Sequence, residues 1–212
     1  MILYAVLAVV VAYLLGSVSF AIIFTKIFTK TDIRESGSGN AGTTNVMREG
    51  GFLPGILTFI FDALKGFVAC YLGKLIFAYA FSSTEWGIYG AFLCGVACML
   101  GHVFPIFFQF RGGKGIATSV GIFAVCCPIA IVFGLAVFAL GVLITKLVSL
   151  SSLIATVTVV SLTIIFYNHE ALFWPQAVLA LVMGIIVVLK HSENIKRLIN
   201  GTENKISVRR KK

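Results

Sequence analysis

Long runs of apolar side chains constrain the fold of this chain more than any other feature. Several runs approach or exceed the ~20 residues that a helix needs to cross the hydrocarbon core of a bilayer. They cover residues 2–24, 53–80, 86–108, 128–145, 148–167 and 172–189. Hydrophobic residues make up 59% of the 212 positions and charged residues 12%, which is more apolar surface than a water-soluble domain can bury. Because strand-like alternation is absent, we expect an all-α, polytopic transmembrane helix bundle rather than a barrel.

A shorter apolar stretch between residues 115 and 127 decides the predicted topology. If it crosses as a short seventh span, the loops at 25–52 and 109–115, the turn at Lys146 and the tail from 190 onward lie on one side. These segments hold 15 of the 17 lysines and arginines, whereas six spans would place basic loops on both sides. By the positive-inside rule, the sequence predicts about seven spans, with the N-terminus outside and the C-terminus in the cytoplasm.

The remaining charges and the cysteines suggest nothing beyond one membrane domain. The opposite loops near 81–87 and 168–174 contain no lysine or arginine. The basic tail at 207–212 is expected to meet anionic lipid headgroups rather than nucleic acid. All five cysteines lie in apolar runs, where a thiol usually packs as a small hydrophobe. We therefore expect a single domain over residues 1–212, with the first run retained as a span and without a disulfide or zinc site.

The first of three polar, glycine-rich segments runs from Arg34 to Gly51 and is rich in small hydroxyl and amide residues. Glycine allows backbone N–H groups to approach an anion closely, and hydroxyl or amide side chains such as Ser38, Thr43 and Asn45 can add donors or cap a helix. Arg48 would supply a guanidinium for phosphate. The alternative is a flexible turn with helix caps, and this segment alone does not decide between the two.

The second polar segment, Gly101 to Gly115, places Arg111 and Lys114 around a double glycine before an apolar run. The N–H groups at a helix start, together with two cations, would form a phosphate cradle. The spacing does not fit a Walker A loop. A positive-inside anchor would explain these charges but not the glycines.

The third polar segment, Lys190 to Gly201, begins where the last apolar run ends. His191 and Asn194 are three residues apart, so on a helix both would lie on one face. Asp62 and Lys65 have the same spacing inside an apolar run, which predicts an internal ion pair facing the bundle. Either pair could be structural or part of a site.

Together the three segments resemble the motifs of the bacterial acyl-phosphate:glycerol-3-phosphate acyltransferase family. The resemblance lies in Gly37-Ser38-Gly39-Asn40, Thr44-Asn45-Val46, Arg48, Gly101-His102-Val103-Phe104-Pro105, Gly112-Gly113-Lys114-Gly115 and His191-Ser192-Glu193-Asn194-Ile195. The resemblance extends over nearly the whole chain, and the expected number of spans also agrees with the family. One such motif would be weak support, whereas three in this order are specific.

The resemblance implies transfer of a fatty acyl group from acyl phosphate to the sn-1 hydroxyl of glycerol 3-phosphate, giving lysophosphatidic acid and phosphate, the first step of phospholipid synthesis. It implies catalytic roles for Ser38, Arg48, Lys114, His191 and Asn194. It implies that the substrates lie against Gly39, Asn40, Thr43, Asn45, Gly112, Gly113 and Glu193. Arg48 and Lys114 would hold phosphate charge, and Glu193 would orient His191 or cap the helix. Ser38 would donate a hydrogen bond rather than act as a nucleophile.

The proton of the attacking hydroxyl could go to His191 or to the donor's own phosphate, and the resemblance favours the phosphate. The expected partners are acyl phosphate, glycerol 3-phosphate and membrane lipids, with no nucleic acid. No cofactor or metal is expected, because the eight acidic residues are scattered. The resemblance places the enzyme in the bacterial inner (plasma) membrane with its active site at the cytoplasmic face. The oligomeric state stays open, a monomer being the simplest case.

Two other classes of protein compete with this interpretation. A transporter for a phosphorylated anion would also combine glycine-rich breaks with buried cations, but the polar residues here concentrate on one side. A ligand-free scaffold would leave the glycine-rich loops unexplained. The acyltransferase pattern of histidine followed five residues later by aspartate is absent, since Phe107, Trp174 and Lys196 follow the three histidines. This argues against that acyl-CoA-dependent class.

Overall fold

The computed structural model describes residues 1–168 and 173–206, and this part of the chain is helical without any strand. Its α-helices are α1 (Ile2–Gly16), α2 (Phe20–Thr29), α3 (Thr43–Gly50), α4 (Phe52–Phe81), α5 (Thr84–Val103), α6 (Ile116–Cys126), α7 (Pro128–Thr145), α8 (Val148–Tyr167), α9 (Phe173–Lys190) and α10 (Ser192–Ile199). Two 3₁₀ turns, η1 (Ile33–Glu35) and η2 (Ile106–Phe108), lie in loops. The predicted all-α fold is confirmed for the described residues. The predicted basic tail at 207–212 and the loop residues His169 and Glu170 lie outside them.

Five apolar stretches are long enough to cross a membrane, which confirms a multi-pass membrane protein. They are Ile2–Thr29, Phe52–Phe81, Thr84–Phe108, Pro128–Thr145 and Val148–Tyr167. A sixth is formed by α9 and α10 if the pair, bent by 60°, is taken as one span. At 11 residues α6 is short for a span, so a seventh crossing at 115–127 stays a prediction.

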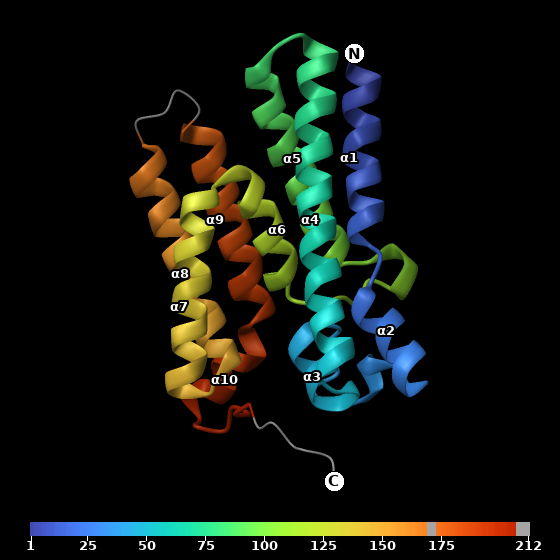
Figure 1. The fold of residues 1–212 in the computed structure, drawn as a ribbon, viewed down its shortest axis with the longest axis vertical. Helices are drawn as coiled ribbons and strands as arrows, with labels where there is room; N and C mark the ends of the chain where they lie inside the picture. The colour runs from blue at the N-terminus through green and yellow to red at the C-terminus, as the bar shows by residue number, and fades with distance from the viewer. Residues whose placement is uncertain (169–172, 207–212) are drawn as a thin grey trace.

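The helices form two groups with α6 between them (Figure 1). Helices α1, α4 and α5 pack together on one side, and α7, α8 and α9 pack together on the other. Successive helices from α4 to α9 alternate in direction, and the two termini lie at opposite ends of the bundle (Figure 1). The loop before α3, the loop between α5 and α6, and α10 therefore lie at one end. The three polar segments of the sequence meet there.

Glycines bring the helices into backbone contact at several crossings. A Cβ atom at Gly16 of α1 would lie 2.1 Å from the carbonyl oxygen of Cys98 on α5. A Cβ at Gly121 of α6 would lie 1.8 Å from the carbonyl oxygen of Ala63 on α4. Small residues of this kind let membrane helices approach closely, where packing rather than the hydrophobic effect holds them together.

A buried ion pair joins α4 to the break between α1 and α2. The Nζ of Lys65 lies 2.7 Å from Oδ1 of Asp62, which confirms the predicted pair. The same Nζ donates a 2.7 Å hydrogen bond to the carbonyl oxygen of Val18, in the short segment between α1 and α2. Because a carbonyl at a helix break lacks its helical donor, Lys65 satisfies a group that would otherwise be unpaired inside the bundle.

The contact at Gly121 yields a test of the packing. We expect Gly121→Val to lower the stability by about 1–3 kcal/mol, the usual cost of overpacking a core, because the side chain would collide with the α4 backbone. Ala124→Val is the matched control, since Ala124 lies on the exposed side of the same helix. Thermal unfolding in detergent measures both, and equal midpoints for the two variants would contradict the proposed contact.

Candidate active site

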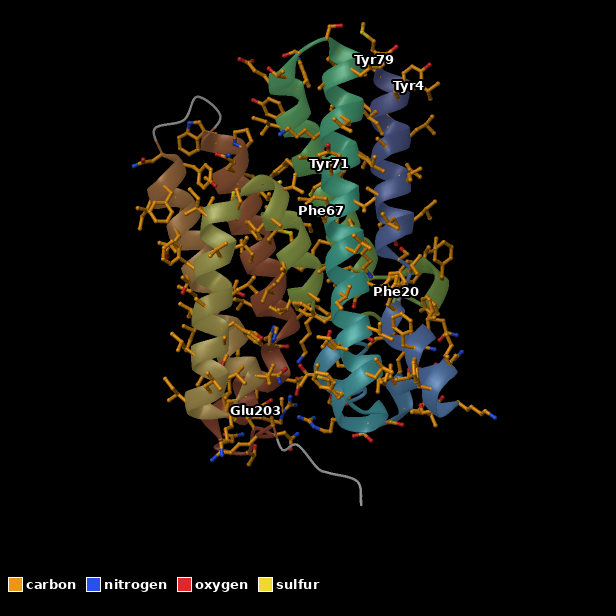
Figure 2. The ribbon with its side chains drawn as sticks, in the orientation of Figure 1. Tyr4, Phe20, Phe67, Tyr71, Tyr79 and Glu203 are labelled. Carbon is orange, nitrogen blue, oxygen red and sulfur yellow. The ribbon has the colours of Figure 1, made fainter. Side chains whose placement is uncertain are left out.

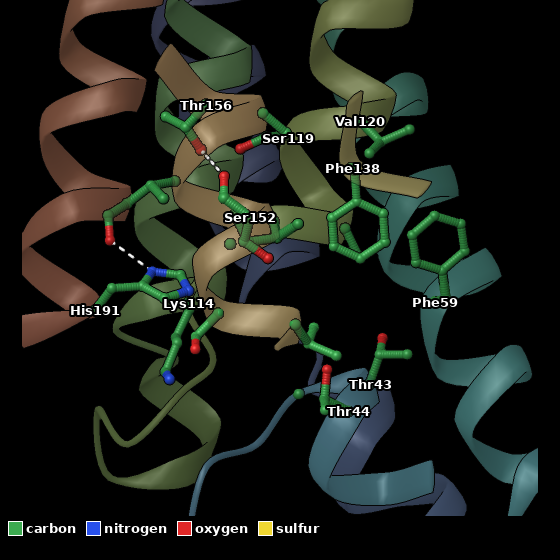
Figure 3. A pocket seen from close by; sticks show the side chains of 18 of the residues that line it. Thr43, Thr44, Phe59, Lys114, Ser119, Val120, Phe138, Ser152, Thr156 and His191 are labelled. Carbon is green, nitrogen blue, oxygen red and sulfur yellow. Dashed lines mark hydrogen bonds between the residues drawn. The ribbon is translucent and has the colours of Figure 1, made fainter. Parts of the chain in front are cut away.

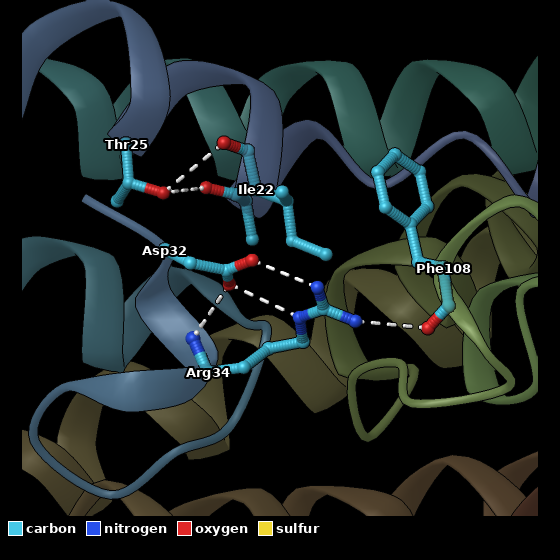
Figure 4. Close-up of polar contacts among 6 residues, drawn as sticks. Ile22, Thr25, Asp32, Arg34 and Phe108 are labelled. Carbon is cyan, nitrogen blue, oxygen red and sulfur yellow. Dashed lines mark hydrogen bonds and ion pairs between the residues drawn. The ribbon is translucent and has the colours of Figure 1, made fainter. Parts of the chain in front are cut away.

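The polar end of the bundle encloses a cavity of about 510 Å³ (Figure 3). Its walls come from the loop before α3, from α3 and α4, from the start of α6, and from α7 to α10. The predicted site residues that line it are Ser38, Asn40, Thr43, Asn45, Arg48, Lys114, His191 and Asn194. Segments that are more than 60 residues apart in the sequence thus contribute to one cavity.

Asn45 holds the first polar loop in shape rather than facing a ligand. Its side chain is buried, and its Oδ1 accepts the backbone N–H of Ser38 at 3.0 Å. Its Nδ2 donates to the carbonyl oxygens of Ile33, Ser36 and Asn40 at 3.0–3.2 Å. The amide is fully used within the loop, so Asn45 shapes this part of the cavity wall, and its contact with substrate stays a prediction. Gly39, with φ of +68°, makes a turn of this loop and does not line the cavity.

Two groups of the first segment are free to bind a ligand. Arg48 is exposed at the cavity, and it forms no ion pair with any of the described residues. The hydroxyl of Thr43 is buried at the cavity wall without a hydrogen-bond partner. A buried donor without a partner costs free energy, so the hydroxyl of Thr43 points to a ligand that carries hydrogen-bond acceptors, and the unpaired guanidinium of Arg48 fits an anionic one.

Lys114 is the cation of the second segment that reaches the cavity. Its side chain points into the cavity (Figure 3). Its Nζ donates a hydrogen bond to Oδ1 of Asn194 on α10. Burial, assisted by the nearby charge of Arg197, lowers the pKa of Lys114 to about 8. Arg111, expected to share this role, is exposed and lies outside the cavity wall. The start of α6, at Gly115, Ile116 and Ala117, completes this side of the cavity.

The double glycine allows the second loop to pack against His102. A Cβ at Gly112 would lie 2.0 Å from the carbonyl oxygen of His102, and a Cβ at Gly113 would lie 2.3 Å from its Nε2. The N–H of Gly113 donates to the same carbonyl at 3.2 Å. Neither glycine lines the cavity. They position Lys114 and do not provide the expected contact with substrate.

His191 presents a neutral imidazole to the cavity (Figure 3). Its Nδ1 lies 2.8 Å from the carbonyl oxygen of Val187. Because a carbonyl can only accept, Nδ1 carries the proton and Nε2 has a free lone pair. Burial lowers the pKa of His191 to about 4, so the ring stays uncharged at neutral pH and can accept a hydrogen bond.

Asn194 belongs to a chain of polar contacts that closes the end of the cavity. Its Nδ2 donates to Oε1 of Glu203 at 2.8 Å, and Nε of Arg197 donates to Oε2 of the same carboxylate at 2.8 Å. Burial alone would raise the pKa of Glu203, but the hydrogen bonds from Asn194 and Arg197 outweigh it and hold this pKa below its ordinary value. The segment that carries Glu203 is tied down where the N–H of Ile206 donates to the carbonyl oxygen of Lys146 at 2.8 Å.

Away from the charged groups the cavity becomes apolar. Its inner walls consist mainly of aliphatic and aromatic residues of α7, α8 and α9, among them Leu135, Phe138, Val159 and Met183. A few hydroxyl groups also line the cavity, among them those of Ser119, Ser152 and Thr156 (Figure 3). The cavity therefore fits a molecule with an anionic head and an apolar tail.

Comparisons with known proteins identify the family. Residues 6–201 match the family described as "Glycerol-3-phosphate acyltransferase". This chain belongs to that family. The family predicted from the sequence is confirmed, and the protein is an acyltransferase.

Relatives of the glycerol-3-phosphate acyltransferase family match along almost the whole chain. The enzyme of Thermoanaerobacter sp. (strain X514) is 42% identical over 96% of both chains. Glycerol-3-phosphate acyltransferase 2 of Bacillus anthracis is 41% identical over 95% of this chain and 98% of its own. The crystal structure of PlsY (YgiH), an integral membrane glycerol 3-phosphate acyltransferase, in its glycerol 3-phosphate form superposes with a TM-score of 0.83 at 36% identity, covering 96% of each chain.

Like the three glycines above, Glu193 is a predicted site residue of this acyltransferase that lies outside the cavity wall. The side chain of Glu193 is 71% exposed, and its Oε1 pairs with Nζ of Lys196 at 3.1 Å. It neither orients His191 nor lines the cavity. The reason is the helix register, because α10 turns Asn194 and Arg197 inward and residues 193 and 196 toward solvent.

Four titratable residues of the cavity wall were not assigned to the site from the sequence. Asp62 and His102 are both buried, with Oδ1 of the first 3.6 Å from Nδ1 of the second. Arg197 and Glu203 form the pair described above. Arg197 is three residues after Asn194, so the helical spacing could have indicated it. Nothing local to Glu203 indicated its position, which depends on the turn at Gly201 with φ of +67°.

The role of Asn45 leads to a test of the first loop. Asn45→Ala would leave the N–H of Ser38 and several carbonyls unpaired, at about 1–3 kcal/mol for each group that stays buried. We expect faster trypsin cleavage after Arg34 and loss of acyl transfer. Glu193→Gln is the control and should change neither property. If trypsin cleaved Asn45→Ala at the same rate as the wild type, the amide would not hold the loop.

Proposed function

We propose that the donor of this acyltransferase is acyl phosphate, the acceptor is the sn-1 hydroxyl of glycerol 3-phosphate, and the products are lysophosphatidic acid and phosphate. The observation that carries the proposal is a single cavity with unpaired phosphate-binding groups at one end and apolar walls at the other. The related PlsY has been crystallised in a glycerol 3-phosphate form and in a lysophosphatidic acid form. An acceptor and a product of these kinds fit the two regions of this cavity.

The phosphate groups would bind at the polar end. Arg48 offers a guanidinium without a carboxylate partner, and Thr43 offers an unpaired hydroxyl. Asn194 holds the ammonium of Lys114 in place. Asn40 and Ser38 line the same region, and Ser38 would donate a hydrogen bond. Preorganised donors of this kind stabilise the charge that develops as phosphate leaves.

The acyl chain would lie along the apolar wall, between α4 and the group of α7, α8 and α9. Phe59 of α4 and Phe138 of α7 face one another there (Figure 3). Apart from this place, α4 and α7 make little contact with each other. This arrangement suits a donor that arrives from the bilayer, because its tail can stay in apolar surroundings while its phosphate reaches the cations.

In the proposed reaction the sn-1 hydroxyl oxygen attacks the carbonyl carbon of the mixed anhydride. The new ester bond forms, the bond from the carbonyl carbon to the phosphate oxygen breaks, and the proton of the hydroxyl passes to the departing phosphate. The free lone pair on Nε2 of His191 would accept a hydrogen bond from the hydroxyl and orient it. Acyl phosphate has a good leaving group, so positioning and charge stabilisation suffice without a covalent intermediate, a cofactor or a metal.

The proposal also includes the membrane topology. We infer one domain that crosses the bacterial inner membrane seven times, with α6 as a short span, the N-terminus outside and the site at the cytoplasmic face. The alternating helix directions and the position of the termini support it (Figure 1). Among the described residues, the lysines and arginines other than Lys65 and Lys74 also lie in the segments at the site end.

The donor and the phosphate-binding groups are tested together. The purified protein in lipid should release phosphate and form lysophosphatidic acid from palmitoyl phosphate plus glycerol 3-phosphate, but not from palmitoyl-CoA. Arg48→Ala and Lys114→Ala should each lower kcat/KM by at least about 100-fold, as removal of a transition-state donor does. Lys196→Ala, at an exposed cation outside the cavity, should be unaffected. Turnover with the CoA donor would contradict the assigned donor, and normal activity of both cavity variants would contradict the site.

The pKa of Lys114 predicts a pH dependence. Because burial lowers this pKa to about 8, the ammonium form is present below pH 8 and is lost as the pH rises above it. If the ammonium binds phosphate, kcat/KM for acyl phosphate should fall through this range, since kcat/KM reports the free enzyme. In Lys114→Arg the guanidinium stays charged, so this fall should disappear from any residual activity. A profile of the wild type that is flat to pH 9.5 would exclude the role.

A further inference from the structure

The end of the bundle opposite the active site contains a second cavity, of about 110 Å³. It lies between α4 and α5 on one side and the end of α6 and the start of α9 on the other. Its two polar side chains are those of Lys74 and Gln176, and the rest of its wall is almost entirely apolar. The acyl-transfer reaction uses neither residue.

Lys74 is a cation inside a membrane span. Its side chain is exposed, and no ion pair links it to any residue in the described ranges. Its stem follows the α4–α5 groove, where a Cβ at Gly87 would lie 3.4 Å from Cγ of Lys74. A charged residue within a span is costly and is usually kept for a function.

Gln176 gives independent support for a ligand. This residue of the first turn of α9 is only 7% exposed, and its Oε1 is buried without a hydrogen-bond partner. An unpaired buried carbonyl oxygen is costly, and a donor on a molecule bound in this cavity would satisfy it. Outward snorkelling of a lysine would explain the position of Lys74 but not this unpaired acceptor.

Aromatic side chains place the cavity at the level of a membrane interface. Trp174, Tyr79 and Trp86 are exposed around this end of the bundle, and Tyr79 lies at its tip (Figure 2). Tryptophan and tyrosine gather where headgroups meet hydrocarbon. Lys74 is seven residues before Phe81 at the end of α4, which is about 10 Å along a helix. Its ammonium therefore lies within reach of lipid phosphates.

We propose that this cavity binds the headgroup of an anionic glycerophospholipid that carries hydroxyl donors, namely phosphatidylglycerol, in the leaflet opposite the active site. The phosphate accepts hydrogen bonds from the Lys74 ammonium, and a headgroup hydroxyl donates to Oε1 of Gln176. The apolar wall, including Phe92 and Leu179, contacts the glycerol backbone and the start of an acyl chain. Phosphatidylcholine supplies the phosphate but no donor for Gln176, so it binds less well.

The test compares lipid retention by the full chain in nanodiscs that contain equal amounts of phosphatidylglycerol and phosphatidylcholine, measured by native mass spectrometry. The wild type should retain phosphatidylglycerol preferentially. Lys74→Met should weaken this retention by about tenfold, as expected for one charge-assisted hydrogen bond. Lys26→Met, at an exposed cation of α2 at the other end, is the matched control and should retain it. Equal retention of both lipids by the wild type, or an equal loss in Lys26→Met, would overturn the site.

Two further arms identify the ligand and separate it from catalysis. Gln176→Leu should abolish the preference for phosphatidylglycerol over phosphatidylcholine and leave acyl transfer unchanged, whereas a preserved preference would remove Gln176 from the site. Excess inorganic phosphate should not displace the lipid. Displacement would show that the cavity binds free phosphate and would overturn the assignment to a phospholipid.

Discussion

The need to pair every backbone polar group inside an apolar bundle governs this structure. A continuous helix meets this need by itself, whereas a functional site requires the helices to break. Lys65 donates to the carbonyl oxygen of Val18 where α1 ends, and the hydroxyl of Tyr13 donates to the carbonyl oxygen of Phe104 at 2.8 Å where α5 ends. Each break is thus repaired by a side chain from a neighbouring helix. The polar loops can leave the bundle at a fixed place because these bonds hold their ends.

The pairing of polar groups also explains why some groups at the site are left unpaired. Most polar side chains near the cavity are used to hold one another, as Asn45 holds the first loop and Glu203 holds Asn194 and Arg197. The unpaired groups at the cavity include the guanidinium of Arg48, the hydroxyl of Thr43 and one ring nitrogen of His191. A few free donors and an acceptor in a rigid setting are what acyl transfer from an activated donor requires.

The sequence predicted the helices and the convergence of the three polar segments because both depend on local or additive properties. The length of an apolar run predicts a span, and the placement of lysines and arginines orders the loops. Roles within the segments were harder to predict. Asn45 and Arg48 are three residues apart on α3, yet one ties the loop and the other faces the cavity. Glu193 and Glu203 are equally acidic, but only the contacts of α10 and the turn at Gly201 decide which one points inward.

The distinction between loop-shaping and ligand-facing residues follows from tertiary contact rather than composition. Gly112 and Gly113 are needed because the ring and carbonyl of His102 lie where a Cβ would be. The Gly112-Gly113 dipeptide does not by itself indicate that His102 lies beside it. The proposed seventh crossing also depends on tertiary contact, because the 11 residues of α6 pack between two groups of helices that only the assembled bundle brings together.

The position of Glu203 has a consequence for the biogenesis of the enzyme. This carboxylate holds Asn194 and Arg197, yet it is synthesised after every helix of the bundle. The bond from Ile206 to the carbonyl of Lys146 fixes its segment to the turn between α7 and α8. A nascent chain with all of its spans inserted would therefore still lack an ordered polar end. We expect acyl transfer to require docking of this segment, because it orders Asn194 and Arg197 at the cavity.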